Sequence, residues 1–316
     1  VYVDDLLIAC SDHKQMQQIK SAISKEVKIV DKGAVQYFLS MEIDRDGETG
    51  SICVGQKSYI QKMLSEYNME NCRPIATPLD TGHQVNCNES KCKKANQTQY
   101  QSLIGSLMYI AVCTRPDILH SVCKLAQRNN DPHSEHMAAA TRILRYLCNT
   151  QDMRLRYYST GKEIECFVDA DWGGDSSERK SYTGYAFILA GSVFSYESKK
   201  QSTVALSSTE AEYMALTSAV KEAVFLQTLL REMRIECPKT IMVNGDNLSA
   251  MNLVKNPVHH ARTKHIDIKY HYIRDIYRGG GIDLKYCCSS DMIADILTKN
   301  LSKPSHEKLT KMLGLN

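Results

Sequence analysis

The chain carries very little net charge, and this limits the kinds of partner it can bind. Its 39 basic and 36 acidic residues leave a formal net charge of +3 over 316 residues. A protein that holds nucleic acid through a broad basic surface would show a clear excess of lysine and arginine. A role in nucleic-acid binding must therefore rest on local motifs.

Long apolar runs are also absent. No stretch approaches the roughly 20 apolar residues that a membrane span needs, so we expect no membrane partner. The apolar fraction of 43%, with 24% charged residues, is typical of a globular protein. The chain begins at Val1 with no secretory leader, which predicts a piece of a longer polypeptide that is not secreted.

Cysteine is abundant, but the spacing that metal sites use is missing. The 12 cysteines include no Cys-x-x-Cys pair, and the closest groupings are Cys87 with Cys92 and Cys287 with Cys288. This irregular spacing argues against a zinc site. We expect reduced and mostly buried thiols.

The length of the chain predicts two or three domains. Residues 1–80 mix short strands with helices, and residues 1–10 suit two strands joined at Asp4-Asp5. Residues 81–160 have mainly helical spacing after a linker near 78–97. Residues 161–316 show three successive strands and then alternating strands and helices, which predicts an α/β domain with helices packed on a mixed sheet.

Four carboxylates in this last part stand out by their positions. Asp169 closes an apolar strand, and Asp246 follows another. Glu212 lies in the first turns of a long helix, and Asp295 has apolar neighbours in a final helix expected from Met292. Such carboxylates are costly to bury unless they are paired or bind a cation. If the four converge, they could hold two Mg²⁺ ions, which prefer oxygen ligands.

Each acid also has a purely structural interpretation. Asp169 could simply end its strand. Asp246 could be the N-cap of a helix beginning at Asn247, and taken alone we favour that interpretation. Asp295 is the hardest of the four to explain in this way, because its neighbours are apolar.

The two glutamates of the long helix have similar alternatives. Glu212 fits a capping box opened by Thr209, and Glu210 fits one opened by Ser207. Taken alone, Glu212 is as well explained by capping as by metal binding.

Seven motifs run through this part of the chain, and a family resemblance carried by them implies how these acids are arranged. They occupy residues 168–172, 181–185, 198–201, 205–213, 246–250, 262–268 and 294–299. In this order they resemble the ribonuclease H domain of copia-type LTR retrotransposons over residues 164–302. The resemblance implies a ribonuclease H-like mixed sheet flanked by helices. It also implies catalytic and metal-binding roles for Asp169, Glu212, Asp246 and Asp295.

Two assignments stay open within this resemblance. Glu210 is the alternative to Glu212 as the metal ligand. Many relatives have a mobile histidine before the last acid, and here Ser289-Ser290-Asp291 occupies that loop. His265 either takes the place of that histidine or has no part in the site.

The resemblance implies an enzyme that cuts the RNA strand of RNA–DNA hybrids with two Mg²⁺ ions, for which Mn²⁺ can substitute. Arg179, Lys180 and Lys299 could neutralise phosphates of the hybrid. The residues that we expect at the phosphates and 2′-OH groups are Lys199, Lys200, Ser207, Ser208, Thr209, Arg262 and Lys264. The alternative is a transposon remnant that binds nucleic acid without cutting it.

The N-terminal part has its own resemblance. Tyr2-Val3-Asp4-Asp5 before Leu-Leu-Ile resembles the catalytic hairpin of reverse transcriptases, in which Asp4 and Asp5 would bind Mg²⁺. Copia-like segments follow at 37–43, 56–60, 77–79, 100–109 and 114–118. They imply a partial reverse-transcriptase palm over 1–80, a helical thumb or connection over 81–160 and a ribonuclease H domain over 161–316.

In that family another palm aspartate and the fingers precede the Tyr-x-Asp-Asp hairpin. We therefore expect no templated DNA synthesis by this chain alone, and we expect the rest of the Pol polyprotein as its partner. The family implies a location in virus-like particles in the cytoplasm, in the nucleus, or in both.

Overall fold

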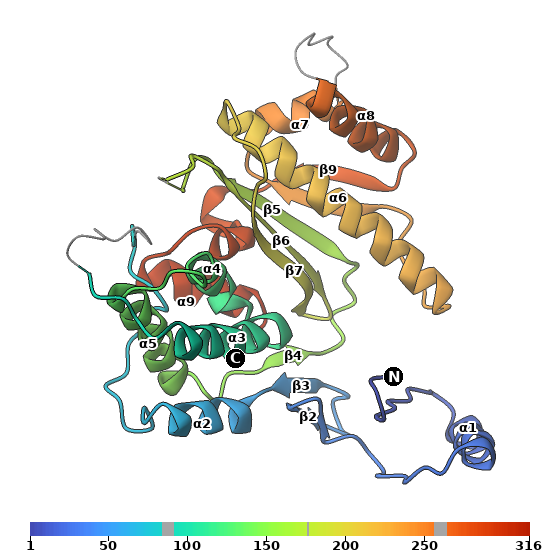
Figure 1. The fold of residues 1–316 in the computed structure, drawn as a ribbon. Coiled ribbons are helices and arrows are strands. Elements are labelled where there is room, and N and C mark those ends of the chain that lie inside the picture. The colour runs from blue at the N-terminus through green and yellow to red at the C-terminus, as the bar shows by residue number, and fades with distance from the viewer. Residues whose placement is uncertain (84–91, 176, 256–263) are drawn as a thin grey trace.

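The computed structural model describes residues 1–83, 92–175, 177–255 and 264–316, with the backbone alone for 264–270 (Figure 1). Two β-sheets and a block of helices make up the described chain. The helices between residues 57 and 149 form a block that packs beside both sheets, so residues from both halves of the sequence meet around it.

The N-terminal segment is the least packed part. Its helix α1 (His13–Glu26) buries no side chain, and Asp12 caps it by accepting a hydrogen bond from the Lys14 N–H. The two strands expected over residues 1–10 are not formed. A single bridge between Tyr2 and Asp5 replaces them. An isolated two-stranded hairpin is only marginally stable. In the described part of the chain, no further strand pairs with residues 1–10 to support such a hairpin.

The first sheet is antiparallel and contains segments from before and after the helical block. Its strands lie in chain order: β1 (Tyr37–Phe38), β2 (Met41–Arg45), β3 (Ile52–Gly55) and β4 (Leu155–Tyr157). Asp46 shapes the turn between β2 and β3, because its carboxylate accepts from the Glu48 N–H at 2.9 Å. Strand β4 returns about a hundred residues later to pair with β3, so the sheet ties the two ends of the helical block together.

The helical block forms much of the first hydrophobic core. Its helices are α2 (Lys57–Glu66), α3 (Gln97–Cys113), α4 (Pro116–Ala126) and α5 (Ser134–Asn149). The side chain of Asn96 caps α3, and α4 starts with Pro116, which needs no hydrogen bond for its own nitrogen. Fully buried side chains such as Leu103 and Ile118 fill the space between the helices.

The second sheet is mixed, as the sequence predicted. It runs in the order β7-β6-β5-β8-β9, with strands β5 (Glu165–Asp171), β6 (Tyr182–Leu189), β7 (Ser192–Lys200), β8 (Ile241–Gly245) and β9 (Ile282–Tyr286). The pairs β5–β6 and β6–β7 are antiparallel, whereas β5–β8 and β8–β9 are parallel. This order is that of a ribonuclease H-like sheet.

Both faces of the second sheet are covered. One face packs against a set of three helices, α6 (Ser208–Glu232), α7 (Leu248–Lys255) and α8 (Lys264–Arg278) (Figure 1). Alternate side chains of β6 point to opposite faces. Phe187 therefore enters the core under α6, while Ala186 joins the core of the helical block.

The C-terminal segment belongs to the same core as the helical block. The α-helix expected from Met292 is instead two short 3₁₀ turns, η1 (Ser289–Asp291) and η2 (Ile293–Leu297), before a separate helix α9 (Lys303–Met312). Pro304, in the first turn of α9, favours a new helix start there. The apolar side chains of this segment pack against α3, α4 and α5: Ile293, Ile296, Leu297, Leu309, Leu313 and Leu315.

The last residues also pair with earlier strands. Arg154 and Asn316 exchange two backbone hydrogen bonds, of 2.9 and 3.1 Å. The first core thus joins residues on both sides of 80 and of 160, and the domain boundaries there stay a prediction. Within the described part of the chain, no helix has both the length and the apolar character that crossing a bilayer requires.

A candidate metal centre at the end of the second sheet

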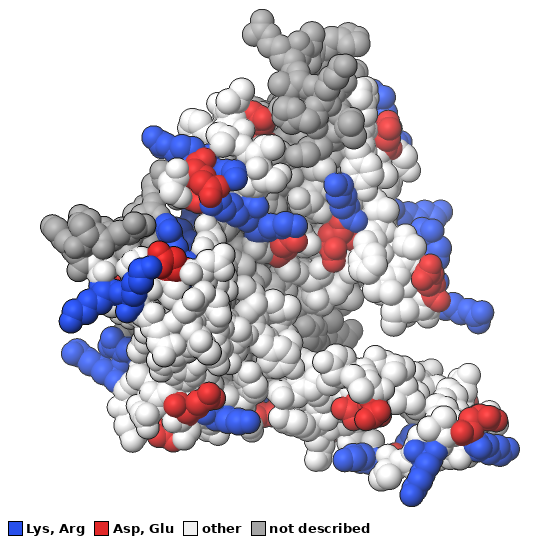
Figure 2. Space-filling model, in the orientation of Figure 1, with Lys and Arg blue, Asp and Glu red and all other residues white. Residues whose placement is uncertain are grey.

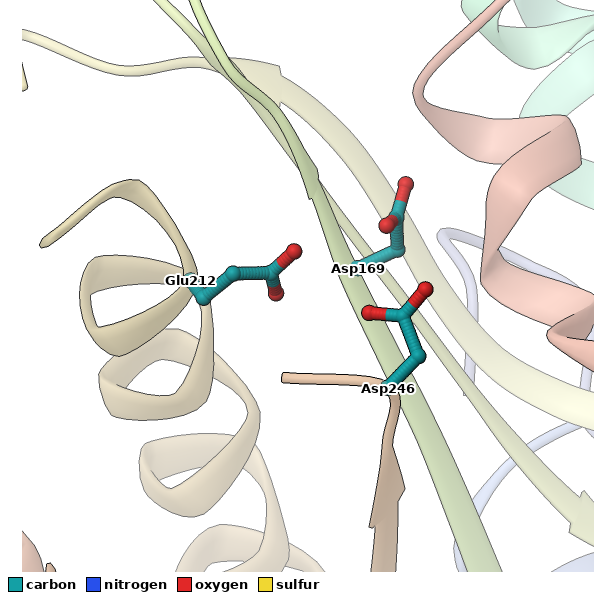
Figure 3. A group of neighbouring side chains, drawn as sticks. All are labelled: Asp169, Glu212 and Asp246. Carbon is teal, nitrogen blue, oxygen red and sulfur yellow. The ribbon is translucent and has the colours of Figure 1, made fainter. Parts of the chain in front are cut away.

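Three carboxylates meet where strands β5 and β8 end (Figure 3). Asp169 lies near the end of β5, Asp246 follows β8, and Glu212 reaches across from α6. Each offers one oxygen, and these oxygens lie within 4.8 Å of one another. The parallel pairing of β5 with β8 brings the first two together, because it places the same ends of both strands side by side.

The start of α6 decides which of its glutamates points into this cluster. Ser207 is the N-cap, and its hydroxyl accepts from the Glu210 N–H at 3.2 Å. The Glu210 carboxylate turns back to accept from the Leu206 N–H at 2.8 Å. Glu210 is therefore a capping residue, whereas the buried Glu212 faces Asp169 and Asp246.

Asp246 is likewise not used as a cap. Helix α7 begins at Leu248, and the side chain of Asn247 accepts from the Ala250 N–H at 2.9 Å. The Asp246 carboxylate accepts instead from the Ser289 hydroxyl at 2.7 Å and stays beside the other acids. The capping interpretation that we favoured for Asp246 alone is wrong, because the next residue takes that position.

The fourth acid, Asp295, is linked to the other three by the Lys299 side chain, which lies close to both Asp295 and Asp169. The Lys299 ammonium lies 3.0 Å from Asp295 Oδ1 and 3.6 Å from Asp169 Oδ2. The Thr298 hydroxyl donates to the same oxygen of Asp169. One short stretch, η2 and the residues just after it, contains Asp295, Thr298 and Lys299. This stretch therefore borders the site on the side opposite α6.

The carboxylates raise one another's pKa values. Burial is the largest cause for Glu212, and together with Asp169 and Asp246 it raises the Glu212 pKa to about 9. Burial, then Asp169, raises the pKa of Asp295 to about 7. Burial also raises the pKa of Asp169, although Lys299 and Thr298 act in the opposite direction.

This donor set fits a divalent metal ion. Asp169 and Glu212 are buried, Asp246 and Asp295 are half-buried, and the acids lie close together, so they cannot all ionise without nearby positive charge. One ammonium, that of Lys299, provides part of this charge. Carboxylate oxygens are the ligands that Mg²⁺ and Mn²⁺ prefer.

The basic residues predicted to hold phosphates are placed in different ways. Lys200 pairs with Asp175 and Glu178, so its charge is already balanced within the protein. Lys180 pairs with Glu178 at 2.6 Å. Lys199 and Arg179 are exposed. Figure 2 shows basic side chains gathered over the upper left of the molecule, where Figure 1 places the end of β7.

The predicted hydroxyl residues lie at the start of α6, near the acids. Ser207 and Ser208 are exposed and Thr209 is half-buried. Arg262 lies outside the described residues, and for Lys264 and His265 only the backbone of α8 is described. Asp4 and Asp5 are exposed at the N-terminus, away from the second sheet (Figure 1).

Sequence reasoning missed three residues of the site. Thr298 and Ser289 hold carboxylates by hydrogen bonds, and Lys299, which we expected at phosphates, lies among the acids. The spacing from Asp295 to Thr298 and Lys299 could have indicated proximity, since residues three or four apart share a helix face. No local signal links Ser289 to Asp246, 43 residues earlier.

Comparison with known proteins places the chain among transposon polyproteins. A family model described as reverse transcriptase (RNA-dependent DNA polymerase) matches residues 1–81. The chain is 37% identical over its whole length to the retrovirus-related Pol polyprotein from transposon TNT 1-94 of Nicotiana tabacum, of which it spans 24%. It is 34% identical to the putative transposon Ty5-1 protein of Saccharomyces cerevisiae, with 70% of the chain and 72% of that protein covered.

Among solved structures, the chain is similar to the N-terminal ribonuclease H domain of a Mycobacterium tuberculosis protein. The identity is 12%, the match covers 47% of this chain and 96% of that one, and the TM-score is 0.34. The ribonuclease H-like fold is identified by the strand order of the second sheet. The chain spans less than a quarter of the length of the plant Pol polyproteins that it matches.

Proposed function

Because the chain belongs to the Pol polyproteins of copia-type retrotransposons, we propose that its second sheet carries a ribonuclease H-type nuclease. This nuclease would cut the RNA strand of RNA–DNA hybrids with two divalent cations. The observation that supports the proposal most strongly is the meeting of Asp169, Glu212 and Asp246 within 4.8 Å, with Asp295 beside them.

The four acids are the residues that would hold the cations. When bound, the cations supply an activated water and stabilise the oxygen that leaves the phosphodiester. Mg²⁺ is the expected ion, and Mn²⁺ offers the same preference for oxygen ligands.

The surrounding side chains keep the acids in place. The Thr298 hydroxyl donates to Asp169, and the Ser289 hydroxyl donates to Asp246. These bonds fix the direction of each carboxylate, as partners of metal ligands generally do. Glu210 holds the first turn of α6 and so fixes the start of the helix that presents Glu212.

The substrate would lie across the exposed start of α6. Ser207, Ser208 and Thr209 could contact 2′-OH groups, and Lys199 could contact a phosphate. In the parent polyprotein Asp4 and Asp5 would belong to the polymerase site, in the palm of which residues 1–80 form a part. The remaining Pol segments would be its partners, inside virus-like particles in the cytoplasm or in the nucleus.

The test uses the whole chain, because α9 packs into the helical block and residues 161–316 alone would expose that core. Purified protein is mixed with an end-labelled RNA–DNA hybrid in Mg²⁺ or in Mn²⁺. We expect cleavage of the RNA strand into fragments with 5′-phosphate and 3′-hydroxyl ends, while single-stranded RNA and double-stranded DNA stay intact. Binding of the hybrid without cleavage in either metal would instead support the alternative, a transposon remnant that binds nucleic acid without cutting it.

A further inference from the structure

The single tryptophan of the chain, Trp172, lies on the surface beside the acid cluster. Its side chain is 56% exposed, although tryptophan is normally largely buried. Two apolar residues of a neighbouring loop are also exposed, Val204 at 45% and Leu206 at 80%. We call Trp172, Val204 and Leu206 the apolar rim.

The rim is held in a fixed position. The indole Nε1–H of Trp172 donates to the Ala205 carbonyl at 3.2 Å, which ties the β5–β6 loop to the β7–α6 loop. After Trp172, the Gly173 N–H donates to the Ser181 hydroxyl at 3.0 Å. The Leu206 N–H donates to Glu210, so the second loop is fixed to the first turn of α6. The ring is thus presented outward by its surroundings.

The rim is connected to the acids through two elements. Trp172 directly follows β5 and is three residues beyond Asp169, which places the two α-carbons at most about 10 Å apart. Leu206 precedes Ser207, the cap of the helix that presents Glu212. A duplex strand advances 3.4 Å per nucleotide, so a strand lying at Asp169 would reach the rim within about three nucleotides.

We propose that the apolar rim contacts the sugars of the nucleic-acid strand next to the metal centre, with Trp172 as its central binding residue. The bases of a duplex are stacked on one another, so the surface they leave to an outside apolar group is the C–H face of the sugar. The strand at Asp169 is the RNA strand that the proposed nuclease cuts, so the rim fits the C–H faces of its riboses about three nucleotides from the scissile phosphate. This inference rests on the proposed function, since it places a hybrid at Asp169.

The charges near the rim favour nucleic acid as its occupant. Exposed Arg179 lies in the β5–β6 loop that begins with Trp172, and exposed Lys199 lies near the end of β7, whereas Lys180 and Lys200 of the neighbouring hollow are paired with Glu178. Figure 2 shows basic side chains over this part of the molecule. An apolar contact bordered by basic residues suits a sugar–phosphate strand.

The test uses the fluorescence of Trp172, which is the only indole in the chain. The full chain is excited at wavelengths that tyrosine does not absorb and titrated with a short blunt RNA–DNA hybrid without metal. We expect the emission to change as the hybrid binds, and acrylamide to quench the bound protein less than the free protein. Binding itself is followed separately by the anisotropy of a label on the hybrid.

Two variants measure the contribution of the contact. Trp172→Ala should weaken hybrid binding by about tenfold, and Trp172→Phe by less, because the phenyl ring keeps an apolar surface. Phe225→Ala is the matched control: Phe225 is 57% exposed on α6 but lies 13 residues beyond Glu212, about 20 Å along the helix. It should bind the hybrid as the unchanged chain does. A circular dichroism melt checks that each variant is folded.

The outcomes separate this inference from the proposed function. If the hybrid binds with no change in emission, no protection from acrylamide and no effect of Trp172→Ala, the rim does not contact the strand and the inference is wrong, whether or not the hybrid is cut. If Trp172 is protected and Trp172→Ala weakens binding but no cleavage occurs, the contact is supported and the nuclease is not. Equal weakening by Phe225→Ala would also overturn the specific role of Trp172.

Discussion

The ammonium nitrogen of Lys299 lies 3.0 Å from Oδ1 of Asp295, four residues earlier in the chain. Burial disfavours a charged lysine, but Asp169 and Asp295 outweigh it and raise the Lys299 pKa to about 12. Lys299 is therefore a fixed positive charge among the carboxylates. Because a metal ion would need the same oxygens, the lysine and the ion compete for them.

Lys299→Met should strengthen metal binding. The change removes a positive charge 3.6 Å from Asp169 Oδ2 while keeping an unbranched side chain, so Mg²⁺ meets less repulsion. We expect the Mg²⁺ concentration that gives half of the rise in melting temperature to fall several-fold. The metal-free variant should melt lower than the unchanged chain, because the acids lose their cation.

Lys303→Met is the control for that change. Lys303 pairs with Glu307 at 3.8 Å on the exposed face of α9 and is outside the acid cluster. Its loss should leave both the metal-free melting temperature and the Mg²⁺ dependence nearly unchanged. Equal effects from the two variants would mean that the position of Lys299 has no special influence on the metal site.

Glu212→Gln should change how stability depends on pH. The folded-state pKa of Glu212 is about 9, against an ordinary value of 4.5, so between these pH values the folded chain holds a proton that the unfolded chain has lost. Without metal, this group therefore stabilises the fold fully below about pH 4.5, and its contribution is lost as the pH rises towards 9. Glutamine does not titrate, so the variant should show a smaller loss.

Urea unfolding across this pH range, with and without Mg²⁺, measures the effect. Glu212→Gln should also reduce the stabilisation by Mg²⁺, since one ligand has lost its charge. Glu210→Gln is the matched control, because Glu210 caps the helix and is not among the clustered acids. A larger loss of Mg²⁺ stabilisation in Glu210→Gln than in Glu212→Gln would reverse our assignment of the ligand.

Two adjacent residues should separate activity from stability. Asp246→Asn keeps the shape of the side chain but removes its charge, and we expect hybrid cleavage to fall by orders of magnitude with little change in folding. Asn247→Ala removes the cap of α7 and should lower the free energy of unfolding by about 1 kcal/mol. Cleavage by Asn247→Ala should persist at a temperature where the chain is folded; its complete loss there would contradict this separation of roles.

The buried pair of Arg115 and Asp117 should be essential for stability. Both side chains are fully buried, and Asp117 also accepts from the Tyr146 hydroxyl at 2.6 Å. Asp117→Ala leaves the guanidinium without its counter-charge, which should lower the free energy of unfolding by about 3–5 kcal/mol. Denaturant titration by circular dichroism measures this loss.

The exposed pair of Arg142 and Asp80 provides the comparison. Its nitrogen and oxygen are 2.6 Å apart, but the Asp80 side chain is mostly exposed. Asp80→Ala should therefore cost less than about 1 kcal/mol. If Asp117→Ala and Asp80→Ala lowered the free energy of unfolding equally, burial would not make the first pair more important for stability than the second.

The sequence alone determined the elements of the second sheet and their order. Apolar strands followed by single acids, and a long helix after Ser207, are local patterns set by side-chain period and capping chemistry. They predicted three successive strands, a long helix and then alternating strands and helices, which is the order that the structure has, and the motif order placed Asp169, Glu212, Asp246 and Asp295 in one candidate site.

Only the tertiary structure decided how neighbouring residues divide their roles. Capping could explain Glu210, Glu212 or Asp246, until the folded chain showed that Glu210 and Asn247 bond to their own helices while Glu212 and Asp246 face the other acids. Lys299 became part of the acid cluster because η2 brings it against β5. The packing of α9 into the helical block was equally hidden, because it depends on contacts between residues more than a hundred positions apart, which no local pattern records.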